Sequence, residues 1–150
     1  MPKLLNKRMV VTINKMCIEM VNERRVRRGL EATEKFSGDN NMIDGNNLSF
    51  VDRIATNDIF GTKPFPTIYH RAAAYMYFII NEHPFIDGNK RTGLATAITF
   101  LEWNNLRFSA FDEKDVFTFV TSLTLPETAD NDPSDDISKV ADWFEGLCIH

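Results

Sequence analysis

The chain has few of the residues that mark disulfide-rich or membrane proteins. It contains two cysteines in 150 residues, Cys17 and Cys148, which lie near opposite ends and do not form a metal-ligand spacing. No apolar run reaches the ~18 residues of a membrane span, and the N-terminus lacks the apolar core of a signal peptide. We therefore expect reduced thiols in a cytoplasmic protein that does not contact a membrane.

Positive charge is not in excess either. The 17 basic and 21 acidic side chains give a net charge of -4, which argues against nucleic-acid binding as the main task. A local exception is the run Arg24-Arg25-Val26-Arg27-Arg28. It is interpreted as the solvated, dipole-favoured end of a helix, and a DNA-binding regulator built on it is the alternative.

Alternating β-branched residues are also lacking, and only short pieces around Thr62–Thr67 and Leu106–Phe108 could be extended. A chain of 150 residues with 43% apolar composition suffices for one core, so we expect one domain over residues 1–150. The predicted fold class is all-α. Apolar spacing predicts helices over Leu4–Gly29 within residues 1–30, Leu48–Ile59, Thr67–Asn81, Gly88–Trp103, Asp112–Leu123 and Ser134–Leu147 within residues 134–148.

Two of these helices have informative faces. The first carries a stripe predicted to face the core, made of Met9, Ile13, Met16, Cys17, Met20 and Val21. The helix over 67–81 is apolar on nearly every side, as a central buried helix would be. Ser37–Asn47 is predicted to be a loop and Pro126–Pro133 an acidic linker. Asp112, and either Ser134 or Asp135, are predicted N-caps.

The chain does carry a dense polar motif at residues 83–93, which reads His-Pro-Phe-Ile-Asp-Gly-Asn-Lys-Arg-Thr-Gly. A helix that begins near Gly88 leaves its first N–H groups unpaired, and these can bind a phosphate. Lys90 and Arg91 lie in its first turn, where the interaction of each cation with the helix dipole is unfavourable by about 0.3 to 1 kcal/mol. An anionic ligand would reverse this penalty. The motif therefore predicts a polyphosphate site.

Three other positions in the motif have alternative interpretations. Asp87 is either the N-cap of the following helix or an oxygen ligand for Mg²⁺. His83 is either an ordinary histidine at a helix C-terminus or a general base for a hydroxyl group. Pro84 and Phe85 are interpreted as structural, because one stiffens the loop and the other anchors it in the core.

These residues resemble the signature of the Fic family, His-Pro-Phe-x-[Asp or Glu]-Gly-Asn-[Gly or Lys]-Arg, and the chain fills every place. The lysine at position 90, followed by Arg91 and Thr92, resembles the motif of the Doc, or death-on-curing, branch. Proteins of that branch are the toxin half of a toxin–antitoxin pair. The resemblance covers roughly Asn47 to Phe144. It implies a compact Fic-type helical bundle with a short β-hairpin-like flap before the central helix.

The resemblance also assigns roles residue by residue. It implies that His83 is the general base, that Asp87 is the Mg²⁺ ligand, and that Arg91 holds a terminal phosphate. The Gly88–Lys90 backbone with Asn89 would form the anion nest. The flap would align an extended target segment by strand addition and would comprise Gly61, Thr62, Lys63 and Pro64.

The implied activity is transfer from ATP, or another nucleoside triphosphate, with Mg²⁺, to a Ser, Thr or Tyr hydroxyl of a target protein. In the Doc branch the γ-phosphate goes to a threonine of elongation factor Tu, and Lys90 favours this phosphotransfer. Pro84 and Gly88 instead follow the AMP-transferring pattern, so AMP transfer is the alternative. A catalytically silent binding module is a further alternative, which the intact His83 and Asp87 argue against.

Regulation by a separate antitoxin protein would fit the Doc interpretation. Many family members instead carry an inhibitory helix reading [Ser or Thr]-x-x-x-Glu-[Gly or Asn], whose glutamate pairs with the motif arginine. No full copy of that pattern is found, and the nearest segment, Ala141–Gly146, lacks the hydroxyl residue. Its resemblance to the pattern is interpreted as coincidence.

Overall fold

The computed structural model describes residues 2–36, 40–43, 46–123 and 133–149 of the chain. Over these residues the regular structure is helical, which confirms the all-α prediction. Extended pairing within them is limited to isolated antiparallel bridges between Met42 and Phe85, Ile59 and Thr62, and Phe108 and Cys148. The helices are α1 (Lys7–Arg27), α2 (Ser49–Thr56), α3 (Ile68–Glu82), α4 (Asn89–Trp103), α5 (Glu113–Leu123) and α6 (Pro133–Leu147).

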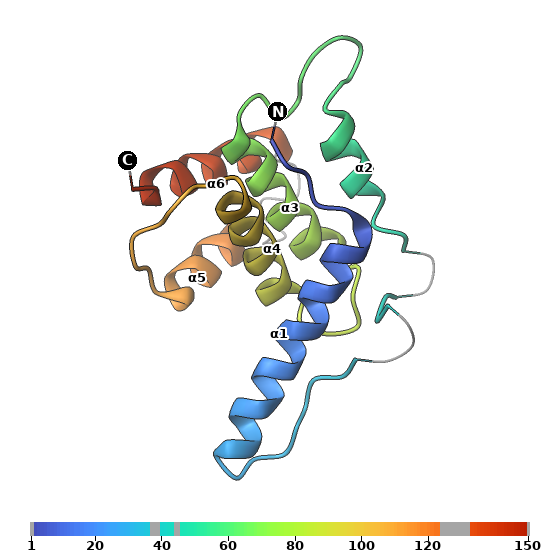
Figure 1. Cartoon of the computed structure of the whole chain (residues 1–150), viewed down its shortest axis with the longest axis vertical. Coiled ribbons are helices and arrows are strands. Elements are labelled where there is room, and N and C mark those ends of the chain that lie inside the picture. Colours follow the sequence, from blue (N-terminus) through green and yellow to red (C-terminus); the bar gives the residue numbers. More distant parts are fainter. Residues whose placement is uncertain (1, 37–39, 44–45, 124–132, 150) are drawn as a thin grey trace.

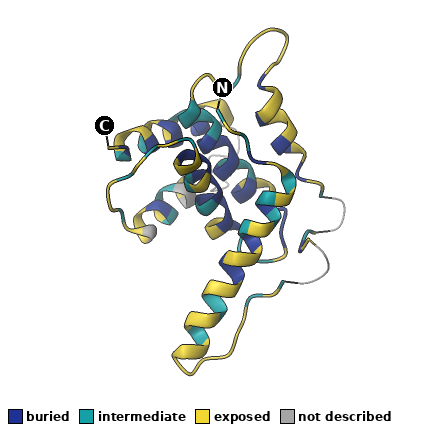
Figure 2. Ribbon diagram, in the orientation of Figure 1, coloured by how far each residue is buried: buried dark blue, intermediate teal, exposed yellow. Residues whose placement is uncertain are grey.

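Helix α3 is the centre of the fold, as its apolar composition predicts. It packs against α4, α6 and α2, while α1 lies across α4 (Figure 1). Figure 2 shows dark blue, buried residues concentrated on α3 and on the faces that surround it. The buried residues of α3 are Ala72, Ala73, Ala74, Tyr75, Met76, Ile79 and Ile80. No helix in the described part of the chain is long and apolar enough to cross a membrane.

Gly93 allows α4 to lie close to α3. A Cβ atom at this position would be 3.1 Å from Ile80 Cγ1 and 3.2 Å from the main-chain oxygen of Met76. Both distances are tight, and one of them involves backbone that cannot move aside cheaply. The absence of a side chain at Gly93 therefore lets the two central helices lie close together.

Helix α1 buries a different face from the predicted one. Its buried residues are Val10, Asn14, Cys17 and Ile18, whereas Met16 is 58% and Met20 48% exposed. The stripe prediction was therefore wrong at these two methionines. The last turns of α1 project beyond the other helices (Figure 1).

The predicted capping chemistry is found at one of the two predicted helix starts. Asp112 accepts a hydrogen bond from the Lys114 N–H at 2.9 Å. Thr67, which was not predicted as a cap, accepts one from the His70 N–H at the start of α3. Helix α6 starts at Pro133, so the predicted caps Ser134 and Asp135 lie inside its first turn instead. Most of the predicted linker, residues 126–132, and part of the predicted loop, residues 37–39 and 44–45, lie outside the described residues.

Candidate active site

His83 occupies the C-cap of α3 in a left-handed conformation, with φ 51° and ψ 55°. Its N–H donates to the main-chain oxygen of Ile79 at 3.1 Å. The following residue, Pro84, disfavours the right-handed helical conformation at position 83, so α3 stops here. The side chain of His83 is exposed and lines a cavity at this end of the helix.

The loop after His83 is fixed by the side chain of Asn89, which is only 4% exposed. Its Oδ1 accepts from the Phe85 N–H at 3.0 Å, and its Nδ2 donates to the Phe85 main-chain oxygen at 2.8 Å. Phe85 itself is fully buried and Pro84 is buried beside it, as the sequence predicts. The amide of Asn89 therefore holds the loop, and the main chain is the part of this residue that faces a ligand at the helix start.

The outer edge of the same loop pairs with the segment Asn41–Ile43. The Ile43 N–H donates to the Pro84 oxygen at 2.8 Å, and the Ile86 N–H donates to the Asn41 oxygen at 2.9 Å. The predicted flap residues lie elsewhere, beyond the opposite end of α3 (Figure 1). A helix of 15 residues is about 22 Å long. The structure thus does not bring Gly61, Thr62, Lys63 or Pro64 to His83.

Gly88 is the N-cap of α4 and has φ 78°. A Cβ atom here would be 3.2 Å from Ile18 Cγ1 and 3.3 Å from Asn14 Nδ2, both on α1. Gly88 therefore serves two needs, a left-handed backbone and the close approach of α1 to the loop. No side chain caps α4 at this position, so its first N–H groups and the positive end of its dipole remain available to an anion.

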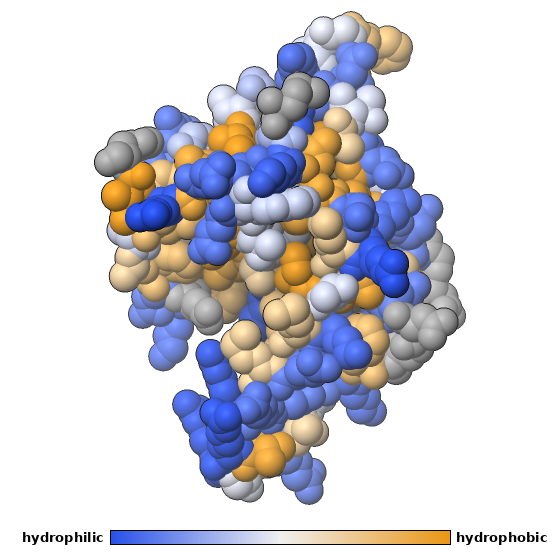
Figure 3. Space-filling view, viewed as in Figure 1, coloured by the Kyte–Doolittle hydropathy of each residue, from blue (hydrophilic) through white to orange (hydrophobic). Residues whose placement is uncertain are grey.

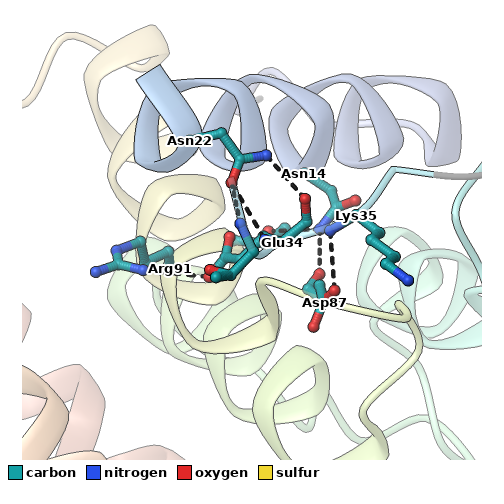
Figure 4. Close-up of polar contacts among 8 residues, drawn as sticks. Asn14, Asn22, Glu34, Lys35, Asp87 and Arg91 are labelled. Atoms are coloured by element: carbon teal, nitrogen blue, oxygen red, sulfur yellow. Dashed lines mark hydrogen bonds and ion pairs between the residues drawn. The ribbon is translucent and has the colours of Figure 1, made fainter. Parts of the chain in front are cut away.

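The carboxylate of Asp87 does not cap α4. Its Oδ2 accepts from the Lys35 N–H at 2.9 Å, so the segment after α1 contacts the loop directly (Figure 4). Within the described residues no group of three or more His, Cys, Asp and Glu side chains forms a metal cage. One carboxylate does suit Mg²⁺ that arrives with phosphates, because this ion keeps several waters and takes few protein ligands.

A residue that the sequence pattern did not single out, Asn14, ties the site together. Its Nδ2 donates to the Asp87 main-chain oxygen at 2.9 Å and to Thr92 Oγ1 at 3.0 Å. Its Oδ1 accepts from Asn41 Nδ2 at 2.9 Å. Asn14 is completely buried. The sequence feature that could have identified Asn14 is that it is a lone amide among the apolar residues Val10, Cys17 and Ile18.

Glu34 is a second residue that the sequence pattern missed. Its Oε1 lies 3.4 Å from Arg91 Nη1, whereas its Oε2 is buried without a hydrogen-bond partner. Asn22 on α1 holds its backbone, accepting from the Glu34 N–H at 3.1 Å and donating to the Glu34 oxygen at 2.8 Å (Figure 4). The ion-pair partner of the motif arginine is therefore Glu34 rather than Glu145 of the Ala141–Gly146 segment.

The environment of Glu34 disfavours its charged form. Burial raises the pKa of the Glu34 carboxyl, the nearby Arg91 lowers it, and the Asp87 carboxylate raises it again, so that the net shift is upward. The negative charge on Glu34 is thus maintained mainly by Arg91. If another anion took Arg91, this carboxylate would lose its main source of stabilisation.

The side chains around the loop enclose a cavity of about 310 Å³, here called the loop cavity. It brings together His83 from the end of α3, the helix start and Glu34 from the segment after α1. Both Lys90 and Arg91 have exposed side chains at its edge. The complete lining is Glu34, Ile80, His83, Gly88, Asn89, Lys90 and Arg91. The His83 imidazole and the uncapped start of α4 therefore face one space.

Comparisons with known proteins identify the family of the chain. The family model described as the Fic/DOC family matches residues 4–101, which include α1, the loop and most of α4. The chain is also similar to the protein named Toxin Doc of Mycolicibacterium smegmatis (strain ATCC 700084 / mc(2)155), with 36% identity over 52 residues. That match covers 35% of this chain and 40% of the relative, so the chain aligns with less than half of that protein.

Proposed function

Because the chain belongs to the Fic/DOC family, we propose that it transfers part of a nucleoside triphosphate, such as ATP, to a hydroxyl group of a target protein. One observation carries the proposal. His83 and the uncapped start of α4 line the same cavity, so a proton acceptor and a phosphate-binding backbone face a common space. A catalytically silent binding module would have no need for that pairing.

The chemistry is a single displacement at phosphorus. The hydroxyl oxygen of the target attacks the γ-phosphorus, the bond to the β–γ bridging oxygen breaks, and the nucleoside diphosphate leaves. The imidazole of His83 takes the hydroxyl proton as the new oxygen–phosphorus bond forms. The N–H groups at the start of α4, with Lys90 and Arg91, stabilise the charge on the phosphate oxygens.

Asp87 is the residue that would hold Mg²⁺. When bound, this ion would neutralise part of the phosphate charge. Asp87 is half-buried and Lys35 donates to one of its carboxylate oxygens. The Asn14 bond to its main-chain oxygen keeps the residue beside the helix start.

Lys90 supports transfer of the γ-phosphate. Its side chain is exposed at the rim of the loop cavity, where a bulky cation would crowd an α-phosphate that carries the nucleoside. AMP transfer is the second candidate, supported by Pro84 and Gly88, which follow the AMP-transferring pattern. In that reaction the hydroxyl would attack the α-phosphorus and diphosphate would leave.

Glu34 would keep the site in a resting state. Its carboxylate contacts the same Arg91 guanidinium that a phosphate needs, so phosphate binding requires this carboxylate to leave. Asn22 holds the Glu34 backbone, Arg91 contacts the Glu34 side chain, and Asp87 accepts from the neighbouring Lys35 N–H. These contacts support competition between Glu34 and the nucleotide.

The similarity to a protein named Toxin Doc supports a role as the toxin of a toxin–antitoxin pair in the cytoplasm, with an antitoxin protein as partner. The target would be a protein with a reactive Ser, Thr or Tyr, such as a translation factor. An extended segment of that target would bind near the paired edge formed by Asn41–Ile43 and the loop. This position replaces the predicted flap at Gly61–Pro64, which lies at the other end of α3.

The deciding experiment labels ATP separately at the α and γ positions and incubates each with the protein, Mg²⁺ and a cell lysate. We expect γ label on a protein band, and His83→Ala should abolish it. Label from the α position would instead support AMP transfer. The absence of any His83-dependent label would refute both reactions.

A further inference from the structure

The arginine run at the end of α1 lines a recess beside the candidate active site. Arg24 and Arg25 lie in the last turn of α1 and Arg28 is its C-cap, as expected for a basic helix end. Their side chains border a space of about 380 Å³, here called the arginine recess. The recess gathers four guanidinium groups around one carboxylate. Its complete lining is Val21, Arg24, Arg25, Arg28, Leu30, Thr33, Glu34 and Arg91.

Positive charge is in excess in this recess. Its one carboxylate, Glu34, already contacts Arg91 at 3.4 Å. The Nε of Arg25 donates to a main-chain oxygen at 2.8 Å, which orients the guanidinium without neutralising it. Among the described residues Arg24 and Arg28 have no ion-pair partner. Because the chain as a whole carries a net charge of -4, three unbalanced cations in one place indicate an anionic ligand.

Apolar side chains accompany these cations. Val21 and Leu30 belong to the lining, and Leu30 is 49% exposed. Met20, the residue before Val21, is 48% exposed. Figure 3 shows the projecting end of α1, at the bottom of the view, as a hydrophilic surface with hydrophobic atoms, in orange, among the blue ones. Apolar surface rimmed by charge is typical of protein contacts, in which Met and Arg are enriched.

A protein segment matches this surface better than a nucleic acid does. Nucleic acids are bound by cations that follow their backbone over many phosphates, whereas these arginines are confined to one helix end of an acidic protein. A guanidinium fork binds a carboxylate through two parallel hydrogen bonds. A segment with acidic and apolar residues would place carboxylates on Arg24 and Arg28 and an apolar side chain on Leu30.

The position of the recess indicates which partner brings that segment. The recess and the loop cavity share only Glu34 and Arg91 in their linings. His83 lines the loop cavity and not the recess, so a segment held by Arg24 and Arg28 leaves it accessible. A partner that blocks the reaction would have to enter the loop cavity. A substrate, in contrast, needs an anchor beside that cavity.

We propose that the arginine recess is a docking site for the target protein, which binds it through an acidic segment that also carries apolar side chains. The inference rests on the proposed function. Docking would hold the target beside the loop cavity while another part of the target places its hydroxyl at His83. Since Arg24, Arg25 and Arg28 lie outside the loop cavity, they would set the affinity for the target and leave the chemical step unchanged.

The first test uses a defined probe, a short fluorescent peptide of glutamate, leucine and serine. We expect Arg24→Gln with Arg28→Gln to bind it about fivefold more weakly, in the range of two exposed charged contacts. The control Arg107→Gln with Lys139→Gln removes the same charge at exposed positions elsewhere and should bind as wild type does. Equal affinities in all three proteins would overturn the docking site.

Further probes check the chemistry of the ligand. Leu30→Ser should weaken binding of the peptide, but not of a version with glycine in place of leucine. Ile149→Ser, a control at another exposed position, should weaken neither. An unchanged affinity in Leu30→Ser would contradict the apolar part of the ligand. Single-stranded RNA and duplex DNA are titrated beside the peptide, and tighter binding that depends on Arg24 and Arg28 would identify a nucleic acid and overturn the assignment.

Target docking also requires that the peptide and the phosphates bind together. We expect inorganic tripolyphosphate with Mg²⁺, at concentrations that saturate the protein, to leave the peptide bound. Displacement of the peptide would mean that both ligands occupy one site, as an inhibitory partner would. That result would overturn the assignment to the target.

Label transfer from ATP to a protein of the lysate provides the functional readout. Arg24→Gln with Arg28→Gln should need about fivefold more lysate to reach the wild-type rate, with the same maximum rate and the same affinity for ATP. Excess peptide should suppress labelling by the wild-type protein. Unlike this KM effect, a general structural defect would lower the maximum rate as well, which would contradict docking.

The two proposals fail in different ways. If label depends on His83 but the two proteins respond equally to lysate and the peptide does not compete, only the docking site is lost. If no label is transferred, the proposed reaction is lost, and with it the target as the source of the segment. The peptide titrations then still decide whether the recess binds an acidic segment.

Discussion

Glu34 and Arg91 are separated by 57 positions in the sequence and meet in an ion pair of 3.4 Å. The guanidinium belongs to the polar motif, whereas the carboxylate comes from an irregular segment that follows α1. One oxygen of the carboxylate is buried without a partner. The pair therefore joins the arginine proposed to bind phosphate to a carboxylate that has one oxygen without a hydrogen-bond partner.

The first prediction concerns that competition. Glu34→Gln removes the negative charge beside Arg91, so ATP and tripolyphosphate should both bind about two- to fivefold more tightly, in the range expected for a half-exposed ion pair. Titration calorimetry would measure the change. Glu31→Gln is the control, because Glu31 is exposed in the same segment. Equal affinities in wild type and Glu34→Gln would refute the competition.

The second prediction concerns pH. Because the pKa of Glu34 is raised, chiefly by burial, this carboxyl takes up its proton at a higher pH than an ordinary glutamate and then releases Arg91. The affinity difference between wild type and Glu34→Gln should thus shrink as the pH falls from neutral toward the raised pKa. Tripolyphosphate titrations at several pH values would show it. A difference that stays constant with pH would contradict the prediction.

The free energy of unfolding should also depend on the protonation of the Glu34 carboxyl. An acid whose pKa is raised by folding contributes stability that is present at low pH and is lost as the pH rises through the folded-state pKa. Thermal melts should therefore show Glu34→Gln gaining stability relative to wild type near neutral pH, with the gain disappearing in acid. A gain that grows on acidification would have the wrong sign.

The third prediction concerns the Asn89 clamp. Asn89→Ala leaves the buried N–H and oxygen of Phe85 without their partners, at a cost of about 2 to 3 kcal/mol. Denaturant unfolding should show this loss, and transfer of label should fall because the loop is no longer fixed. Asn81→Ala is the control, since Asn81 is exposed and donates to the Tyr77 oxygen within α3. A similar loss in both variants would argue against the clamp.

The fourth prediction separates backbone strain from packing at two glycines. Gly88 and Gly29 have nearly equal φ angles, 78° and 77°, but a Cβ atom at Gly29 would meet nothing within 4 Å. Gly29→Ala should cost about 1 kcal/mol of strain, and Gly88→Ala should cost about 1 to 3 kcal/mol more because it pushes against α1. Denaturant unfolding measures both. Equal losses would mean that α1 moves aside freely.

Local sequence predicted much of the fold because its signals act over a few residues. Asp112 caps the start of α5 as predicted, Pro84 follows the residue that ends α3, and the apolar composition of α3 marks the central helix. The prediction for α1 failed at Met16 and Met20, since spacing identifies an apolar face but not whether another element covers it. The predicted flap residues 61–64 precede α3 and His83 follows it, so the length of the helix separates them.

The sequence by itself determined the helical class and the polar loop, and the motif placed the chain in its family, since capping, periodicity and motif chemistry are properties of neighbouring residues. Tertiary structure alone decided that Asn14 bridges three segments, that Glu34 pairs with Arg91, and that Arg24, Arg25 and Arg28 line a recess together with Arg91. Each of these contacts joins residues far apart in the chain. Their positions depend on how α1 packs across α4, which no local pattern specifies.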